Sequence, residues 1–469
     1  MLKKSITVLS ISAAFFVNAQ DVSIIKNTVD IYSGNQLDGS AKFNSMAGSM
    51  GALGGDVSAI AVNPAGLGVF ITSNVNGTLS INKTKTTSSL ANTSNSYELS
   101  NTNLGQLGGV AVFEVGRTSP WKFVNIGVNY SNRNIEEYIE TAGNSGYSFQ
   151  DSNLVDNSGN TVTGTFTSQG HAYNRTGHLT NMNIALGGNY DNKFYVGGSL
   201  NFKGASIVQY DSALLGLDLD NNSYYFDKQG TPYTEDSNGF SLSAGVIGKL
   251  NNNVRLGLSL ESPTWWSLAR VYNEVLKDDL GYYGKTYTED RTLTTPMKAT
   301  LSGAFVASKN FALNVDYTLG VTKPKYKDPG PLPDGDESAE HQLNSFFSSD
   351  YKNLSELRVG AEYRYNNFRL RGGYGIANSP FDSKAGFSDL YIGKRETLGL
   401  GVGFDFKSFY IDAAYNRIKI NSTNVYGGGE YYNLANNGDV NFFVYNPNDF
   451  TSKLKDVRDN INLTVGFKF

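Results

Sequence analysis

Side chains that carry enzymatic or metal chemistry are scarce in this chain. It has no cysteine and three histidines, His171, His178 and His341. A hydrolytic enzyme needs a nucleophile beside a base, which is usually histidine, and none of these histidines stands in such a motif. The missing thiols exclude zinc–thiolate sites and disulfides. We therefore predict no enzymatic activity, no catalytic residue, no metal site and no cofactor, with a haem-binding receptor that uses these histidines as an alternative.

A glycine-rich stretch, GSAKFNSMAGSMGALGGDVSAIAVNPAGLGVF at residues 39–70, is the second candidate for chemistry. It has neither the G-x-x-x-x-G-K-[ST] nor the G-x-G-x-x-G spacing, and no strand is expected before it, so a phosphate-binding loop is excluded. Met46 and Met50 recur at helical spacing instead. Near its end, a proline that can start a helical turn is followed by a glycine that can end it, in the motif Asn63, Pro64, Ala65 and Gly66. The stretch predicts a compact knot of short helices.

Charge and the N-terminus restrict the class of protein further. The chain has 39 basic and 43 acidic residues and a net charge of −4, so it has no basic field that would attract nucleic acid. At the N-terminus, Lys3 and Lys4 precede an apolar run at residues 6–17 and a small-residue site that ends at Ala19. This pattern is that of a secretory signal, and the run is too short to span a bilayer. We predict a signal peptide at residues 1–19 and an exported protein.

The remaining chain is rich in strands that alternate apolar and polar residues. Many are about ten residues long, as a tilted strand needs to cross a bilayer. Short and long connections alternate between them, which is typical of a bacterial outer-membrane barrel with periplasmic turns and outer loops. The fourteen predicted strands lie at 69–82, 104–115, 122–133, 178–190, 193–206, 238–250, 253–262, 292–308, 311–320, 355–366, 367–377, 394–406, 408–420 and 457–469. Residues 134–177 and 207–237 are among the predicted outer loops.

The two faces of these strands differ in polarity. On 394–406, Leu398, Leu400 and Val402 share one face, while glycines share the other. Charged residues of both signs fall on the opposite face of neighbouring strands, and we expect them to pair inside the barrel: Arg369, Arg371 and Asp412. We therefore predict an all-β fold, a 14-stranded antiparallel transmembrane β-barrel over residues 69–469, in the bacterial outer membrane with lipid around it.

Two further features complete this prediction. The last strand, INLTVGFKF, ends on Phe469, which resembles the signal that the outer-membrane barrel assembly machinery reads. A ring of fourteen strands is wider than the eight-stranded barrels that side chains fill unaided. We therefore expect residues 20–68, between the signal peptide and the first strand, to form a helical hatch that plugs the lumen.

At this point the chain resembles a known family. GALGGDVSAIAVNPAGL is similar to the hatch of the outer-membrane long-chain fatty acid transporters and the related toluene channels (FadL/TodX), which carries an Asn-Pro-Ala motif. LRVGAEYRYNNFRLRGGYGI (357–376) and LGLGVGFDFKSFYIDAAY (398–415) look like late hairpins of that family. The resemblance implies passive transport of hydrophobic molecules such as long-chain fatty acids. It further implies an outer groove, a lumenal pocket and sideways release into the membrane through a gap at a kinked strand.

Apolar clusters in two predicted outer loops and in the hatch are the candidate ligand contacts. Exposed clusters of this kind often mark a binding surface. The candidates are Leu214, Leu215, Leu217, Trp265, Trp266, Leu268, Phe43, Met46 and Met50. The two tryptophans could equally lie in the aromatic girdle at the membrane interface, and the hatch residues could simply pack the plug. A general porin is the other alternative, although the hatch and the apolar loops argue against a wide aqueous pore.

Overall fold

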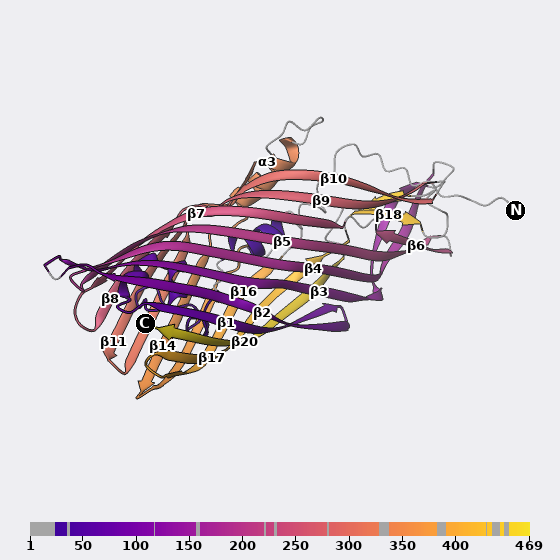
Figure 1. Cartoon of the computed structure of the whole chain (residues 1–469). Helices are drawn as coiled ribbons and strands as arrows, with labels where there is room; N and C mark the ends of the chain where they lie inside the picture. Colours follow the sequence, from indigo (N-terminus) through magenta and orange to yellow (C-terminus); the bar gives the residue numbers. More distant parts are fainter. Residues whose placement is uncertain are drawn as a thin grey trace.

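The fold is an elongated cylinder of strands with short helices inside it (Figure 1). The computed structural model describes residues 24–34, 38–116, 118–155, 160–219, 222–228, 232–278, 281–327, 337–381, 391–427, 429–433, 441–444 and 450–469. The predicted signal peptide, residues 1–19, lies outside the described residues.

Fourteen antiparallel strands form a closed hydrogen-bonded ring, as predicted. The first and last strands close it, with Asn74 opposite Lys468. In ring order the strands are β1 (Asn74–Leu90), β2 (Thr93–Glu114), β3 (Trp121–Val155), β4 (Thr161–Tyr190), β5 (Phe194–Leu219), β7 (Tyr233–Lys249), β8 (Val254–Glu261), β11 (Lys298–Ser308), β12 (Phe311–Gly320), β14 (Ser355–Tyr365), β15 (Phe368–Ala377), β16 (Ile392–Asp405), β17 (Phe409–Val425) and β20 (Thr451–Lys468).

Six further strands lie at the long-loop end. β9 (Trp265–Asp278) and β10 (Gly281–Thr294) continue the line of β8 and β11 after breaks that contain Pro263 and Pro296, where proline cannot donate to the ladder. β13 (Lys325–Lys327) pairs with β10. On the other side, β6 (Asn222–Lys228) pairs with β5 and with β18 (Gly429–Asn433), which in turn pairs with β19 (Asn441–Val444).

The ring wall is apolar outside and polar inside. Outward side chains such as Leu398, Leu400 and Val402 on β16 are 43%, 52% and 53% exposed, while inward side chains such as Asn314 and Asp316 on β12 are fully buried. Alternation of this kind suits a wall with lipid on one side. In the described part of the chain, no helix has the length and apolarity that a membrane-spanning helix requires.

Several strands are longer than the sequence predicts. β3 has 35 residues and β4 has 30, and together they fill most of residues 134–177, which were predicted to be a loop. β5 likewise runs into the predicted loop at residues 207–237. About ten residues suffice to cross a bilayer, so the surplus extends beyond it, toward β6 and β18 (Figure 1). Water can wet both faces there, and the apolar–polar alternation that identified the membrane-spanning parts is lost.

The predicted hatch segment divides into two parts. From here on, the hatch means residues 38–69, which form short helices as predicted: α2 (Ala41–Ser45), η2 (Val57–Ala61) and η3 (Pro64–Val69). They are capped at their starts by the side chains of Ser40, Asp56 and Asn63 respectively. Each of these side chains accepts a hydrogen bond from a backbone N–H of the helix that it caps. Gly54 has a φ of +61°, and a Cβ there would lie 2.7 Å from the carbonyl oxygen of Gly66. Only glycine allows this close approach, which folds the hatch back on itself.

A further helical segment, residues 24–33, lies in the long-loop half of the lumen. Its second part is a π-helix, η1 (Thr28–Ser33). Residues 24–33 and the outer helix α3 (Glu337–Ser349) contribute to one buried apolar cluster, which includes Ile25, Val29, Phe346 and Phe347. The lumen is thus filled from two sides, by the hatch below and by this N-terminal helix above.

Candidate functional site

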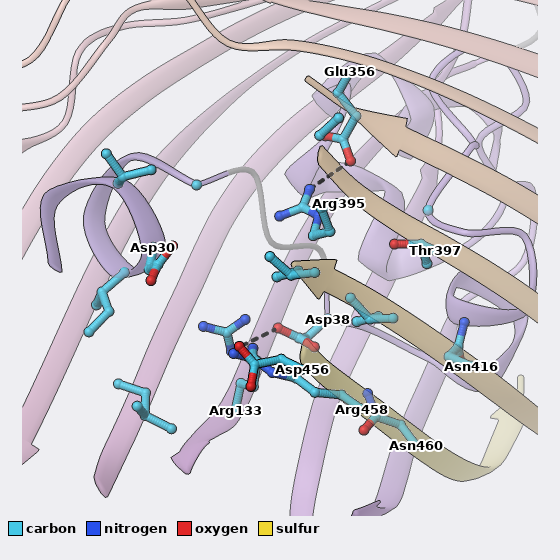
Figure 2. A pocket seen from close by; sticks show the side chains of 18 of the residues that line it. Asp30, Asp38, Arg133, Glu356, Arg395, Thr397, Asn416, Asp456, Arg458 and Asn460 are labelled. Carbon is cyan, nitrogen blue, oxygen red and sulfur yellow. Dashed lines mark hydrogen bonds and ion pairs between the residues drawn. The ribbon is translucent and has the colours of Figure 1, made fainter. Parts of the chain in front are cut away.

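A cavity of about 160 Å³ lies between the N-terminal helix and the hatch. One side of it is strongly charged (Figure 2). Arg395 Nη2 pairs with Glu356 Oε1 at 2.7 Å, and Arg133 Nε lies 3.9 Å from Asp38 Oδ2. Charges of both signs therefore line this wall and largely pair with one another.

Two buried cations next to the hatch, Arg358 and Lys298, form no ion pair within 4.0 Å with a carboxylate of the described residues. Arg358 is 2% exposed; its Nη2 donates to Thr318 Oγ1 at 3.0 Å, but its Nε and Nη1 have no hydrogen-bond partner. Lys298 is 8% exposed, and its side chain makes no hydrogen bond and no ion pair within 4.0 Å with the described residues. Glu261, which is opposite it in the ladder, and Glu356 act on it electrostatically. Both line one small cavity beside the hatch, and Arg358 also lines the larger one. Such groups are costly to bury unless an anion or water meets them.

The carboxylates nearby are already engaged. Glu261, which lines the same small cavity, accepts from Lys203 Nζ at 2.7 Å and from Ser241 Oγ at 3.0 Å. Glu356 pairs with Arg395. Arg358 and Lys298 therefore form a positively charged floor that can receive an anionic group.

Apolar side chains also line the cavity, next to charged ones. Val29 and Ile31 of the N-terminal helix, with Ile135 and Ile392 of the barrel, line it. An adjoining chamber of about 90 Å³ is lined by Trp266 and Leu179 together with Lys298. The indole N–H of Trp266 is buried without a partner among the described residues. The combined space is amphipathic, lined by both apolar and charged side chains.

The N-terminal helix is held over this cavity by a buried charged network. Lys26 Nζ pairs with Glu137 Oε1 at 2.5 Å, and Arg175 Nη2 pairs with Glu137 Oε2 at 2.6 Å. All three side chains are at least nine-tenths buried. Tyr32 adds a hydrogen bond from its hydroxyl to Glu235 Oε1 at 2.5 Å. The helix is thereby tied to β3, β4 and β7.

The ring wall has a break between β2 and β3. These strands pair from Glu114 opposite Phe123 up to Gln106 opposite Ser131, and there the ladder stops although both strands continue. The break begins next to a register shift at Gly105. Beyond it, Asn103 Nδ2 donates to the Asn132 carbonyl at 3.1 Å. In that region, side chains rather than a backbone ladder connect β2 and β3.

The lumenal cavity approaches the outer surface along β3, which forms one edge of this break. A depression of about 410 Å³ shares Asn132, Ile135 and Glu136 with the lumenal cavity and extends to Tyr130 and His178. Polar atoms near the break are buried without a partner in the described part of the chain: Asn101 Nδ2, Asn132 Oδ1, Arg133 Nε and Glu136 Oε2. Hydrogen-bonding groups therefore lie along the edges of the break, near both the lumenal cavity and this depression.

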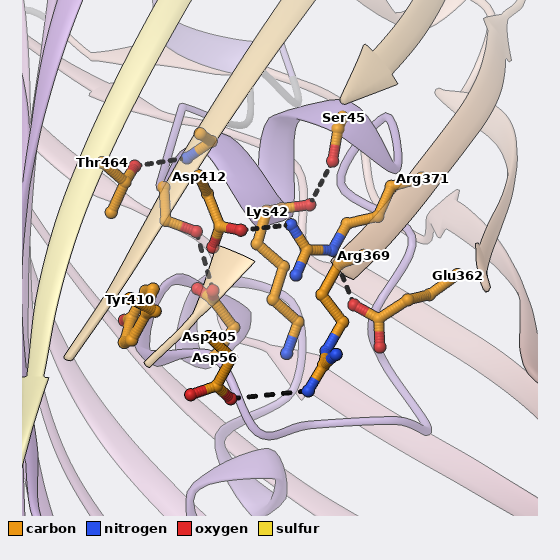
Figure 3. Close-up of polar contacts among 12 residues, drawn as sticks. Lys42, Ser45, Asp56, Glu362, Arg369, Arg371, Asp405, Tyr410, Asp412 and Thr464 are labelled. Carbon is orange, nitrogen blue, oxygen red and sulfur yellow. Dashed lines mark hydrogen bonds and ion pairs between the residues drawn. The ribbon is translucent and has the colours of Figure 1, made fainter. Parts of the chain in front are cut away.

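A second polar cluster lies where the hatch meets the wall on the short-turn side, and Ala41 N of the hatch donates to Thr464 Oγ1 of the wall there (Figure 3). Arg371 pairs with Asp412 and with Glu362, each at 2.6 Å, and Arg369 lies 3.5 Å from Asp405. The expected pairing of opposite charges inside the barrel is thus present. On the hatch itself, Ser40 Oγ donates to Asp56 Oδ2 at 2.7 Å.

The candidate ligand contacts fall into four places. Trp265 is 49% exposed on the outer surface, whereas Trp266 is 3% exposed and lines the lumenal chamber. Leu268 belongs to the buried cluster of the N-terminal helix. Leu215 and Leu217 are buried in a separate apolar cluster of the outer strands, and Leu214, on the same strand, is partly buried. The hatch candidates Phe43, Met46 and Met50 pack together in the hatch core.

The histidines lie apart from one another and from the charged floor. His171 is buried; its Nε2 lies 2.7 Å from Asp211 Oδ1 and its ring stacks on Tyr426. Burial is the main cause that lowers the pKa of His171, against the opposite effect of Asp211. His178 and His341 are exposed. In the described residues, no group of three or more acidic, histidine or cysteine side chains could hold a metal ion.

The residues that matter most in this geometry were not singled out from the sequence. Arg358 falls on the polar face of a predicted strand, so the sequence predicts that its side chain points into the barrel. The sequence does not predict that two of its guanidinium nitrogens lack a hydrogen-bond partner among the described residues. Lys298, Lys26 and Glu137 come from segments far apart in the chain, and only the closed ring brings them to one lumen. The pairing of Lys26 with Glu137 spans 111 positions.

The chain was compared with known families and structures. It matches a family model described as outer membrane protein transport protein (OMPP1/FadL/TodX) over residues 38–441. A search of curated proteins finds no match. Among solved structures, a Pseudomonas aeruginosa FadL homologue is 12% identical with a TM-score of 0.55, over 92% of this chain and 98% of that chain.

Two further structures give similar values. The Pseudomonas putida toluene transporter TodX is 14% identical with a TM-score of 0.54, over 92% of this chain and 99% of that chain. The CymD monoaromatic hydrocarbon channel is 12% identical with a TM-score of 0.53, over 93% and 98%. At these identities the likeness shows a common fold.

Proposed function

Because the chain belongs to the OMPP1/FadL/TodX family of outer membrane transport proteins, and is therefore a bacterial outer-membrane transporter of hydrophobic compounds, we propose that it carries amphipathic acids such as long-chain fatty acids. We further propose that it works passively and releases them sideways into the membrane. Both points go beyond family membership, since relatives include a FadL homologue and a toluene transporter.

The observation that carries the first point is the unpaired positive floor of the cavity. A bare hydrocarbon would leave Nε and Nη1 of Arg358 and the ammonium group of Lys298 without a hydrogen-bond partner in the described part of the chain. A carboxylate would accept charge-assisted hydrogen bonds from them. Its apolar chain would lie against Val29, Ile31 and Trp266 and gain roughly 0.8 kcal/mol per buried methylene.

Sideways release is supported by the break between β2 and β3. An apolar chain that leaves through the wall passes from the cavity to lipid without crossing bulk water. The donors Asn101 Nδ2 and Arg133 Nε, which have no hydrogen-bond partner among the described residues, would accompany the acid group on the way. The hatch closes the other end of the lumen, where Gly51 N donates to both carboxylate oxygens of Asp316 at 3.2 and 3.1 Å.

The ligand class is tested by binding to the purified full-length protein in detergent. We expect oleate to change the fluorescence of Trp266 saturably, in a background where Trp121 and Trp265 are replaced by Phe. Combining Arg358→Gln with Lys298→Gln should weaken oleate binding on the order of tenfold or more, while Lys83→Gln, at an exposed lysine, should not. Equal affinity for oleate and toluene, unchanged by the double variant, would contradict the proposal.

The route is tested by closing the break. The chain has no cysteine, so Asn103→Cys with Asn132→Cys introduces the two thiols alone. We expect oxidation to slow uptake of a fluorescent long-chain acid by cells, and reduction to restore it. Each single variant, which cannot form the bridge, should transport normally under both conditions. Unchanged uptake by the bridged protein would rule out this route.

A further inference from the structure

A separate pocket lies on the opposite side of the hatch, at the rim formed by the short turns. It has a volume of about 210 Å³ and lies between the hatch and the near ends of β8, β11, β12 and β14. Its apolar walls are formed by Leu53, Val69, Val306 and Ala312, backed by the buried Met46 and Met50. In the outer-membrane orientation of such barrels, this rim faces the periplasm.

Positive charge surrounds this pocket in excess of negative charge. Lys42, Arg255, Lys309 and Arg364 line it, against the single carboxylate of Glu362. That carboxylate is already engaged, since it accepts from Arg371 Nε and from Arg364 Nε, each at 2.6 Å. Figure 3 shows the Lys42 chain directed past this cluster.

Arg364 pairs with Glu362, whereas Lys42, Arg255 and Lys309 form no ion pair within 4.0 Å with a carboxylate of the described residues. Arg255 Nη1 donates to the Leu53 carbonyl at 3.2 Å, while its Nε is buried without a partner. Lys42 Nζ donates to the Gly55 carbonyl at 2.9 Å. Lys309 and Arg364 are exposed at the mouth. The pocket therefore combines an apolar wall, open access from the rim and cations that a carboxylate would satisfy.

From this juxtaposition we infer a second binding site, on the periplasmic face of the hatch, for the carboxylate and adjoining apolar segment of an acyl or aryl acid. The acid group lies against Arg255 and Lys309, and the apolar segment lies against Leu53, Val69 and Val306. The site is separate from the lumenal cavity, because the hatch lies between them. Its ligand can reach it from the periplasm without passing the hatch.

The test is photolabelling of the purified full-length protein with a medium-chain carboxylic acid that carries a diazirine at its methyl end. Mass spectrometry then locates the label. We expect label on peptides that contain Leu53, Val69 or Val306. Arg255→Gln combined with Lys309→Gln should reduce this label on the order of tenfold. The methyl ester of the same probe should label these peptides equally weakly in both proteins.

Controls separate this site from the lumenal one and from misfolding. Lys193→Gln, at an exposed lysine of another short turn, should leave the label unchanged. Label near Trp266 reports the lumenal cavity, and it should persist in the double variant, which also shows that the barrel is folded. Absence of label at the hatch underside, or equal label in the double variant or from the ester, would overturn the inference, whatever the lumenal label does.

Discussion

The hatch and the N-terminal helix both occlude the lumen, but they are attached to the barrel in different ways. The hatch uses its backbone: Met50 N donates to Asp316 Oδ2 at 2.9 Å, and Ala41 N donates to Thr464 Oγ1 at 2.7 Å. Among the described residues, the hydrogen bonds between the N-terminal helix and the barrel come from side chains, such as Lys26 and Tyr32.

This difference indicates which plug is the movable one. Side-chain contacts can be exchanged for a ligand's groups without unfolding the segment, whereas the hatch would have to leave backbone N–H groups unpaired. We therefore expect a ligand to displace the helix that covers the cavity and to leave the hatch in place.

The strongest test of this comparison removes one plug or both. Deletion of residues 21–66 takes away the hatch together with the N-terminal helix, and we expect a large conductance in planar bilayers. Deletion of residues 21–34 removes the helix alone and should leave the conductance near that of the intact protein. A large conductance already present in the intact protein, or in the shorter deletion, would show that the hatch does not close the lumen.

Glu137→Ala should release the N-terminal helix. It leaves Lys26 and Arg175 buried without their shared carboxylate, which costs about 3–5 kcal/mol for a buried pair. We expect faster hydrogen exchange across residues 24–33, with exchange in the hatch unchanged. Glu137→Gln keeps the shape and an acceptor and should have a smaller effect. If the hatch loosens together with the helix, the two plugs are one cooperative unit.

Asp316→Asn probes the hatch in the same way. The carboxylate accepts from Met50 N and Gly51 N and also from Asn314 Nδ2, so its loss should destabilise the hatch locally by about 1–3 kcal/mol. Hydrogen exchange at Met50 and Gly51 should rise, while residues 24–33 keep their protection. The opposite pattern would mean that the helix depends on the hatch.

The smallest expected effect comes from the cap of the last hatch helix. Asn63 Oδ1 accepts from Ala65 N at 3.0 Å, and its Nδ2 donates to the Gly51 carbonyl at 2.8 Å. Asn63→Ala should cost about 1 kcal/mol and raise exchange only near Ala65. Asn63→Asp, which keeps the cap but loses the Nδ2 donor, separates the two contributions. No change in exchange would show that the cap is redundant.

The ring and the hatch could be predicted from the sequence because each carries its own local signal. Outward leucines and valines alternate with small or polar inward residues where lipid covers one face, and Asn63-Pro64 marks a helix start whatever surrounds it. Both signals depend on neighbours within a few positions of the chain.

The long outer strands and the site lack such signals. Thr161–Gly177 mostly carries polar, glycine and histidine residues, so neither face appears apolar and the segment resembles a loop. The N-terminal helix is recognisable only through its contacts with Glu137 and Glu235, which lie more than one hundred positions away. Nε and Nη1 of Arg358 have no hydrogen-bond partner among the described residues. This, too, depends on the positions of Thr318 and Arg395 in the closed ring.

The point at which β2 and β3 part has a mechanical consequence. A closed cylinder resists widening because every strand is tied to both neighbours, so any expansion must tear a ladder. Between the pair Gln106 and Ser131 and the outer rim, no backbone ladder joins β2 to β3, so the cylinder is open along one line there. It can spread there by loosening side chains such as the stacked Tyr97 and Tyr138, while the ladder below keeps its register and holds the barrel together.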